Sequence, residues 1–409
     1  MTKQLLALAL GIITAIGGFV DIGDVVFAAQ AGAEFGYGLL WVLPIAVYGI
    51  MLYSEMTGRI AIVTGRTVFD TIRTMYPPKI SFAALLLSVI ATFMTCAAEI
   101  GGVALILQLL SGFSYPILIV FVVLAFGAIC WLLPFQTIER VFGYMGLLVI
   151  IFLIVAVKTL PGFHLISSGL IPSLLGHSPM SYWYFAVGLF ATTMMPYEIY
   201  FYSSGAIEEK WGKKDLFKNV FNSYIGYLLG ALVVLGIIVA AANVLLPLAI
   251  SPDFVGTPVL MTARSLGQAG VLVALLGLLF SIGSSTVETA FSGAYNISQY
   301  AGWKWGKRLP KRKTHKFTAS WMSILILGGA LIMTGIDPVE LTEYAVIFSV
   351  LVMPLTFFPI LKVANNHTIM GKFVNGRFRK ITSHVFFGII ILVSIAAVPL
   401  MILSQQGKL

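Results

Sequence analysis

Two carboxylates, Asp21 and Asp24, lie one turn apart inside a long apolar segment near the start of the chain, with Gly23 between them. A later apolar segment is interrupted in a similar way by the stretch from Thr192 to Glu198, which contains Pro196. A helix broken inside hydrocarbon strands backbone N–H and C=O groups, so breaks are tolerated only where those groups line a cavity or coordinate a ligand. The two interruptions therefore predict a substrate site buried in a membrane, between the halves of an inverted-repeat transporter.

The acidic residues near these breaks are the first candidate ligands. Asp21 leads, because an intramembrane carboxylate is unfavourable unless it meets a cation or a proton, and no Lys or Arg is expected at its depth. Asp24 adds a second carboxylate; the pair favours a cation if both are ionised, and otherwise the two share a proton. Glu198 is either a third acidic ligand or a group at the cytoplasmic exit. Glu288 follows Ser284-Ser285-Thr286 and either forms a second ion site with these hydroxyls or makes a helix–helix hydrogen bond.

The composition requires a polytopic membrane protein. Apolar residues make up 59% of the 409 positions and charged residues 10%, which excludes an ordinary soluble domain. Cys96 and Cys130 fall within expected helices, so a disulfide framework or a cysteine metal cluster is excluded. Apolar runs of about 20 residues predict eleven spans, namely 6–31, 39–57, 81–110, 116–134, 141–158, 182–206, 220–247, 268–297, 318–336, 342–363 and 384–404.

The basic residues predict the topology. With the N-terminus in the cytoplasm, all but three of the 25 Lys and Arg residues lie inside, the exceptions being Lys158, Arg264 and Lys408. This distribution follows the positive-inside rule, and eleven spans then put the C-terminus outside, in what we expect to be a bacterial inner membrane. The most basic loop, Lys304 to Lys316, is either purely topogenic or in contact with anionic lipid headgroups.

The spans divide into two units of five with one left over. Residues 1–160 form the first expected inverted repeat, 161–365 the second, and 366–409 hold the eleventh span. Each repeat opens with a broken helix, the first and the sixth span, which is the arrangement of the LeuT-type 5+5 fold. We therefore expect an all-α membrane protein that exposes its site to each side in turn.

Three further strings carry a resemblance over nearly the whole chain. They are Phe35-Gly36-Tyr37-Gly38-Leu39-Leu40-Trp41, Gly58-Arg59 followed by Ile62-Val63-Thr64-Gly65-Arg66, and Met370-Gly371-Lys372-Phe373-Val374-Asn375. Together with the two breaks they resemble the NRAMP family of divalent-metal transporters, whose motifs at these breaks read Asp-Pro-Gly-Asn and Met-Pro-His. The chain departs from both motifs. Ile22 replaces the proline, so Gly23 alone must permit the first break, and Asp24 replaces the asparagine.

The resemblance implies a ligand set and an altered proton pathway. Asp21 and Met195 match the metal-binding aspartate and methionine, and a soft thioether favours Mn or Fe over Mg and Ca. Thr192 stands where the family offers a backbone carbonyl. Tyr197 and Tyr202 replace the family's two histidines, so no histidine relay crosses the membrane centre. Of an acidic pair in the third span only Glu99 survives, beside Cys96; the coupling candidates are therefore Glu99, Tyr202 and Glu288.

The function expected from these residues is secondary transport of a divalent metal cation, Mn or Fe favoured by Met195 and Mg by Asp24, with weak or absent proton coupling. One alternative is a diverged transporter of another small solute such as bicarbonate, held at a half-helix N-terminus. Another is a membrane sensor that binds an ion without moving it. An enzyme is not expected, because no nucleophile, base and orienting group converge by spacing. The expected partners are a small ion and the lipid bilayer; no cofactor and no nucleic acid is expected, and the oligomeric state is not specified by the sequence.

Overall fold

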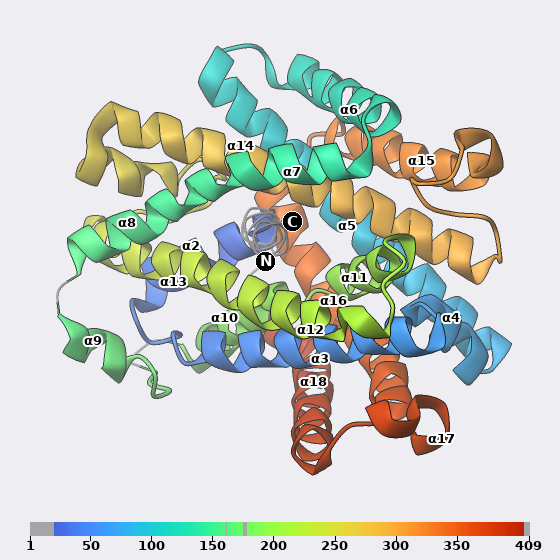
Figure 1. The fold of residues 1–409 in the computed structure, drawn as a ribbon. Coiled ribbons are helices and arrows are strands. Elements are labelled where there is room, and N and C mark those ends of the chain that lie inside the picture. Colours follow the sequence, from blue (N-terminus) through green and yellow to red (C-terminus); the bar gives the residue numbers. More distant parts are fainter. Residues whose placement is uncertain (1–19, 161, 175–177, 405–409) are drawn as a thin grey trace.

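The structure, a computed structural model, describes residues 20–160, 162–174 and 178–404, and all their regular secondary structure is helical (Figure 1). The helices are α2 (Ile22–Phe35), α3 (Val42–Thr64), α4 (Val68–Met75), α5 (Pro78–Ser111), α6 (Tyr115–Leu132), α7 (Phe135–Gly146), α8 (Ile150–Thr159), α9 (Phe163–Ser168), α10 (Pro179–Thr193), α11 (Pro196–Glu208), α12 (Leu216–Phe221), α13 (Tyr227–Val244), α14 (Val259–Tyr300), α15 (His315–Ile332), α16 (Pro338–Ala364), α17 (His367–Met370) and α18 (Arg377–Ser404).

Most of the predicted spans coincide with helices. Within the described residues, eight helical segments are long and apolar enough to cross a membrane, and they match the third to fifth and the seventh to eleventh predicted spans. The second predicted span corresponds to α3, and the sixth to α10 and α11 together. Residues 6–19 of the first predicted span lie outside the described residues. A total of eleven spans therefore stays a prediction.

Helix α3 continues past the predicted end of the second span, from 57 to Thr64. Hydropathy ends the span early because Glu55 and Arg59 are charged. In the structure both are buried and neutralise each other: Arg59 Nε lies 2.9 Å from Glu55 Oε1, with Arg379 at 3.3 Å from the same oxygen. The ninth span, predicted to reach 336, ends with α15 at Ile332.

The broken helices lie inside the bundle. In Figure 1, α3 and α14 run along opposite sides of the view, with α2, α10, α11 and α16 between them. Helix α2 packs against α10 and α13, and α11 packs against both α3 and α14. Helices α5 and α14, the longest two, pack against each other and form one wall of this interior.

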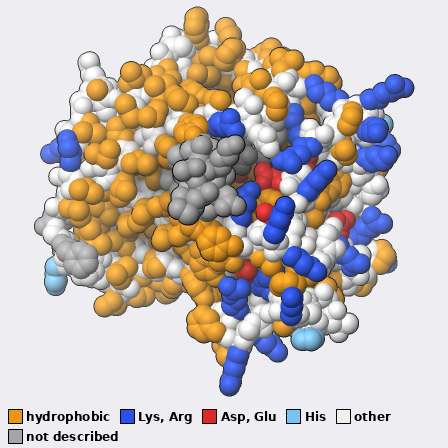
Figure 2. Space-filling model, viewed as in Figure 1, with side chains coloured by type: hydrophobic (Ala, Val, Ile, Leu, Met, Phe, Trp, Pro, Cys, Tyr) orange, Lys and Arg blue, Asp and Glu red, His pale blue; other side chains and the backbone are white. Residues whose placement is uncertain are grey.

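The basic loops meet at one end of the bundle, which we call the basic side. Arg59 donates hydrogen bonds to Asn375 Oδ1 and to the carbonyl of Phe373, and Arg308 pairs with Glu209 at 3.9 Å. Figure 2 shows Lys and Arg side chains gathered on one part of the surface, while hydrophobic side chains dominate the rest of that face. Loops that are far apart in the sequence thus share one side, as the predicted topology requires.

Candidate functional site

The second predicted break is present and is narrower than expected. Helix α10 ends at Thr193; Met194 (φ −117°, ψ 38°) and Met195 (φ −61°, ψ 128°) are non-helical, and α11 begins at Pro196. Proline restricts the residue before it to extended backbone and is itself favoured at the first helical position. It has no N–H, so the carbonyl of Thr192, four residues earlier, cannot receive the usual helical hydrogen bond. This oxygen is freed for another partner.

At the first predicted break, α2 begins at Ile22, and Asp21 is its N-cap. The Asp21 Oδ1 atom accepts a hydrogen bond from the backbone N–H of Asp24 at 2.8 Å, the usual way in which an aspartate satisfies a free N–H at a helix start. The expectation that Gly23 permits the break by its backbone freedom is wrong, because Gly23 lies inside the first turn of α2. The residues before Val20 lie outside the described residues.

Gly23 is needed for space instead. A Cβ atom there would lie 3.1 Å from Asp21 Oδ1, 3.1 Å from the Thr192 side chain and 3.3 Å from that of Val346 on α16. The start of α2 is therefore packed closely against α10 and α16. This close packing brings Asp21 to the break in the sixth span, as the two-break pattern predicts.

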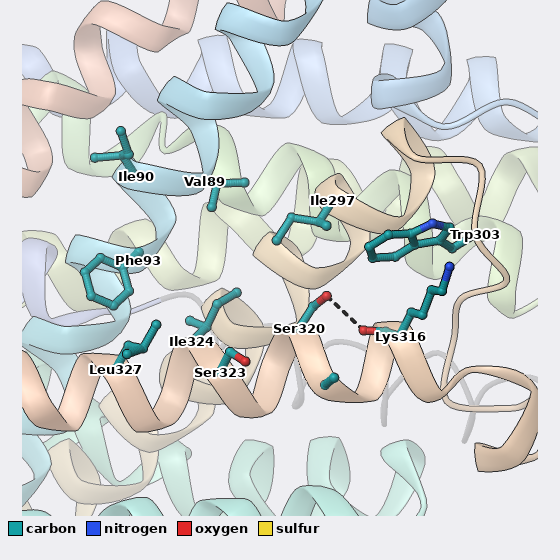
Figure 3. A pocket seen from close by; sticks show the side chains of 11 residues that line it. Val89, Ile90, Phe93, Ile297, Trp303, Lys316, Ser320, Ser323, Ile324 and Leu327 are labelled. Atoms are coloured by element: carbon teal, nitrogen blue, oxygen red, sulfur yellow. Dashed lines mark hydrogen bonds between the residues drawn. The ribbon is translucent and has the colours of Figure 1, made fainter.

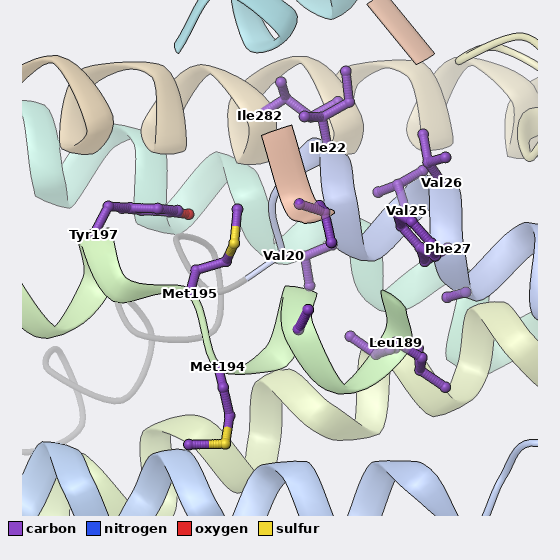
Figure 4. Packing of buried hydrophobic residues seen from close by; sticks show 14 of the residues in the cluster. Val20, Ile22, Val25, Val26, Phe27, Leu189, Met194, Met195, Tyr197 and Ile282 are labelled. Carbon is purple, nitrogen blue, oxygen red and sulfur yellow. The ribbon is translucent and has the colours of Figure 1, made fainter. Parts of the chain in front are cut away.

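The two methionines of the break point in opposite directions. Figure 4 shows the Met195 side chain directed toward the start of α2 near Val20, whereas Met194 points away. The sulfur of Met194 packs beside Gly49 of α3, 2.8 Å from where a Cβ would be. Both methionines are buried. Met195, the residue named from the sequence, is thus the thioether that faces Asp21's end of α2.

A continuous series of oxygen atoms leads from Asp21 to Glu99. Tyr197 Oη lies 3.1 Å from Asp21 Oδ2 and 3.0 Å from Ser285 Oγ. Ser285 donates to Glu99 Oε1, and Thr289 Oγ1 donates to Glu99 Oε2 at 2.7 Å. All five residues are buried. Helices α2, α11, α14 and α5 each contribute to this series, which we call the hydroxyl chain (Asp21, Tyr197, Ser285, Glu99).

Asp24 and Glu198 extend the acidic character of the site on its other flank. Asp24 is fully buried, lies beside Asp21 and Thr192, and has no hydrogen-bond partner on either oxygen among the described residues. The Thr192 hydroxyl donates to the carbonyl of Leu189 instead, at 3.2 Å. Glu198 lies in the first turn of α11, where the negative charges of Asp24 and Glu288 would repel its own. The Oε1 atom of Glu288 accepts from Ser284 at 3.3 Å.

The donor set is mixed. Across the described ranges, no three His, Cys, Asp or Glu side chains are placed so that they could share one metal ion. The donors that the two helix starts and the break bring to this region are the carboxylates of Asp21 and Asp24, the Met195 thioether and the freed carbonyl of Thr192. Oxygen and thioether ligands together suit a first-row divalent ion.

Tyr202, the second tyrosine at a histidine position, lies apart from the hydroxyl chain. Its hydroxyl donates to Asn219 Oδ1 at 3.0 Å, and its ring contacts Trp211 at 5.9 Å. Cys96, in the span of Glu99, packs with its thiol 3.8 Å from the carbonyl of Thr286. Neither side chain reaches Asp21 through a described hydrogen bond.

Two sets of buried contacts were not predicted. Ser285 and Thr289 share one face of α14 because they are four residues apart, and this spacing is a signal that could have paired them with a carboxylate. Glu343 is buried on α16 and accepts from Gln30 of α2 at 2.8 Å and from Tyr184 of α10 at 3.4 Å. No local pattern indicates that contact, because its two partners come from two other helices, α2 and α10.

Known proteins resemble this chain over nearly its whole length. The model of the Nramp family, described as natural resistance-associated macrophage protein-like, matches residues 11–399. The chain is 26% identical over 411 residues to divalent metal cation transporter MntH 1 of Pseudomonas aeruginosa, covering 95% of this chain and 90% of the relative. It is 24% identical to MntH of Levilactobacillus brevis, covering 92% and 85%.

Solved structures show the same fold. A manganese transporter of Eremococcus coleocola superposes with a TM-score of 0.74 at 19% identity, over 98% of this chain and 87% of the other. The nucleobase-cation-symport-1 family transporter Mhp1 superposes with a TM-score of 0.60 at 14% identity, over 96% and 90%. These matches confirm the predicted fold class, an all-α membrane protein with the LeuT-type arrangement of broken helices.

Proposed function

The chain belongs to the Nramp family, and we propose on that basis that it is a secondary transporter that carries a divalent metal cation across the membrane by alternating access. The observation that carries the proposal is the meeting of the Asp21 cap of α2 with the Met194–Met195 break. The metal is the substrate of this site. Residues 1–160 and 161–365 would be the two repeats that move around it, with 366–409 as the added eleventh span, and the basic side would face the cytoplasm.

The charge at the two helix starts supports a cation. The N-terminus of a helix carries a partial positive charge, which the bicarbonate alternative would use to hold an anion. Here both starts already carry carboxylates, Asp21 and Asp24 on α2 and Glu198 on α11. A second anion would be repelled by these groups. Met195 favours Mn²⁺ or Fe²⁺, while the extra carboxylate of Asp24 also suits Mg²⁺.

Counting hydrogen atoms along the hydroxyl chain supports altered proton coupling. Three contacts join Asp21, Tyr197, Ser285 and Glu99, but the two hydroxyls supply only two hydrogens. One carboxyl group must therefore be protonated for all three contacts to be hydrogen bonds. If the proton is on Glu99, every donor points toward Asp21; if it is on Asp21, every donor points toward Glu99.

This count predicts how metal binding affects the proton. A metal at Asp21 needs the ionised carboxylate, which places the proton on Glu99. Without metal, the same proton is held by either end of the chain. Metal binding then moves a proton within the protein and need not release it to solution. We therefore expect transport with weak or absent proton coupling.

The test is Mn²⁺ flux into proteoliposomes of the purified protein, with Mg²⁺ and bicarbonate as competitors. Asp21→Asn keeps a good capping residue for α2 but removes the charge, so it should fold and lose Mn²⁺ uptake. Asp337→Asn is the matched control, since Asp337 caps α16 in the same way at an exposed position. Full Mn²⁺ flux in Asp21→Asn would remove the proposed site, competition by bicarbonate alone would favour an anion transporter, and Mn²⁺ binding without flux would favour a sensor.

A further inference from the structure

A groove of about 610 Å³ lies between α5, α14 and α15, away from the metal site. Ligand sites commonly occupy about 300–1,000 Å³, so the groove is large enough for one ligand. Figure 3 shows Trp303 and Lys316 at one end of it and Phe93 and Leu327 at the other. Lys316 and Leu327 are both exposed, so the groove is open along α15.

The chemistry of the walls points to an apolar occupant. Between the two ends, the lining is formed by aliphatic side chains such as Val89 and Ile297, and its hydroxyls are those of Ser320 and Ser323. Ser320 already donates to the carbonyl of Lys316 at 2.9 Å. A polar solute would find few partners there, whereas a hydrocarbon chain gains by burial.

One end of the groove carries an unneutralised cation. The Lys316 Nζ atom lies 4.8 Å from the centre of the Trp303 ring. Lys316 forms no ion pair with any carboxylate of the described chain, whose ion pairs involve Arg59, Lys218, Arg308 and Arg379. Tryptophan is enriched at the level of lipid headgroups, and lysine on the cytoplasmic side attracts anionic lipids.

The depth of the groove matches one leaflet. Lys316 and Leu327 are eleven residues apart on α15, which is about 16 Å along the helix. The hydrocarbon core of a bilayer is about 30 Å thick, so the groove runs from the headgroup level to near the midplane. A single acyl chain that enters from the basic side would follow this path.

We propose that this groove is a binding site for one anionic phospholipid, with its phosphate at Lys316 and one acyl chain along α5 and α15. The site is independent of the metal-binding residues. It also gives a structural role to the basic loop from Lys304 to Lys316, which the transport site does not use. Trp303 and Lys316 would fix the height of the headgroup, and Phe93 and Leu327 would contact the end of the chain.

The experiment is native mass spectrometry of the full chain in detergent, titrated with phosphatidylglycerol or phosphatidylcholine of the same chain length. Lys316→Gln should weaken phosphatidylglycerol binding about five-fold, the effect of one lysine near an anionic lipid surface, and leave phosphatidylcholine unchanged. Ser323→Trp, which fills the groove, should weaken both lipids. The matched controls are Lys311→Gln, in the same loop but over the Trp131 ring at 4.2 Å, and Ile326→Trp, at an exposed α15 position outside the groove.

Retention of phosphatidylglycerol that depends on Lys316 but not on Lys311 would support the site even if Ser323→Trp failed to fold. Equal binding of the two lipids, or equal effects of Lys316→Gln and Lys311→Gln, would overturn it in favour of a general lipid annulus. Displacement of the lipid by inorganic phosphate at equal concentration would also overturn it, since the acyl chain would then contribute nothing. None of these outcomes depends on Mn²⁺ flux.

Discussion

Replacing Glu99 by glutamine tests the proton count of the hydroxyl chain most directly. The amide nitrogen of the glutamine side chain can donate to Ser285 permanently, while its oxygen still accepts from Thr289. In the hydroxyl chain, every donor then points toward Asp21, as it does when Glu99 is protonated. Asp21 is left ionised for the metal. We expect Glu99→Gln to retain Mn²⁺ uptake within about three-fold of the parent protein, well short of the ten-fold change that about 1.4 kcal/mol represents.

The magnitude follows from the hydrogen bonds. If Asp21 and Glu99 were both ionised, one of the three contacts would lack a hydrogen. A hydrogen bond to a charged group contributes about 1.5–3 kcal/mol, so this contact strengthens binding of the shared proton by roughly 10- to 150-fold. Glu99→Ala, by contrast, removes the hydrogen-bond partner of Ser285 in either arrangement of the proton, and a buried polar group without its partner costs about 1–3 kcal/mol. Thr289 keeps the carbonyl of Ser285 at 2.9 Å as an acceptor.

The assay combines Mn²⁺ uptake in proteoliposomes with a pH-sensitive dye inside them. Glu99→Gln should transport Mn²⁺ with no more internal acidification than the parent protein, and Glu99→Ala should show reduced thermal stability and uptake. Tyr202→Phe is a control, since Tyr202 bonds to Asn219 outside the chain. The reasoning is refuted if Glu99→Gln binds Mn²⁺ normally but does not transport it, because Glu99 would then have to lose its proton in each cycle. Acidification in proportion to Mn²⁺ flux in the parent protein would refute it as well.

Three other substitutions probe the site and its surroundings. Met195→Leu should raise the Kd for Mn²⁺ roughly ten-fold, about 1.4 kcal/mol, and leave the Kd for Mg²⁺ nearly unchanged, because only the softer ion gains from a thioether. Equal changes of the two Kd values in isothermal titration calorimetry would exclude sulfur as a ligand. Gly23→Ala should cost about 1–3 kcal/mol through overpacking against Asp21 and Thr192 and weaken Mn²⁺ binding, and unchanged affinity would mean that the start of α2 has room to shift. Glu343→Ala should lower the unfolding free energy by about 2–4 kcal/mol, because two buried hydrogen bonds are lost. Glu340 is half-buried, and Glu340→Ala should change the unfolding free energy by less than about 0.5 kcal/mol. Equal shifts of the two variants in thermal unfolding would contradict this prediction.

Features that depend on short stretches of chain could be predicted from the sequence. Eight spans follow from apolar runs. In hydrocarbon, a single segment can satisfy its own backbone hydrogen bonds only as a helix, so an apolar run of sufficient length predicts one. The break before Pro196 follows from two local rules, the missing N–H and the extended preference of Met195. Helix α2 begins where the first break was predicted, but Gly23 was given the wrong role: the Asp21 side chain caps the helix, and the glycine supplies space to a neighbouring helix.

Features that join distant segments needed the tertiary structure. Glu99 and Ser285 are 186 residues apart in the sequence, and Gln30 and Glu343 are 313 apart. A hydropathy profile shows each of them only as a polar residue in an apolar helix and does not indicate its partner. The same limit hid the length of α3, since distant residues complete the pairing of Glu55 and Arg59: Arg379 for the first, and Asn375 and the Phe373 carbonyl for the second. The sequence thus determined which residues are costly to bury, through composition and backbone chemistry. Only the packing of α2, α5, α11 and α14 decided how those residues satisfy one another, because hydrogen bonds require contact within about 3 Å.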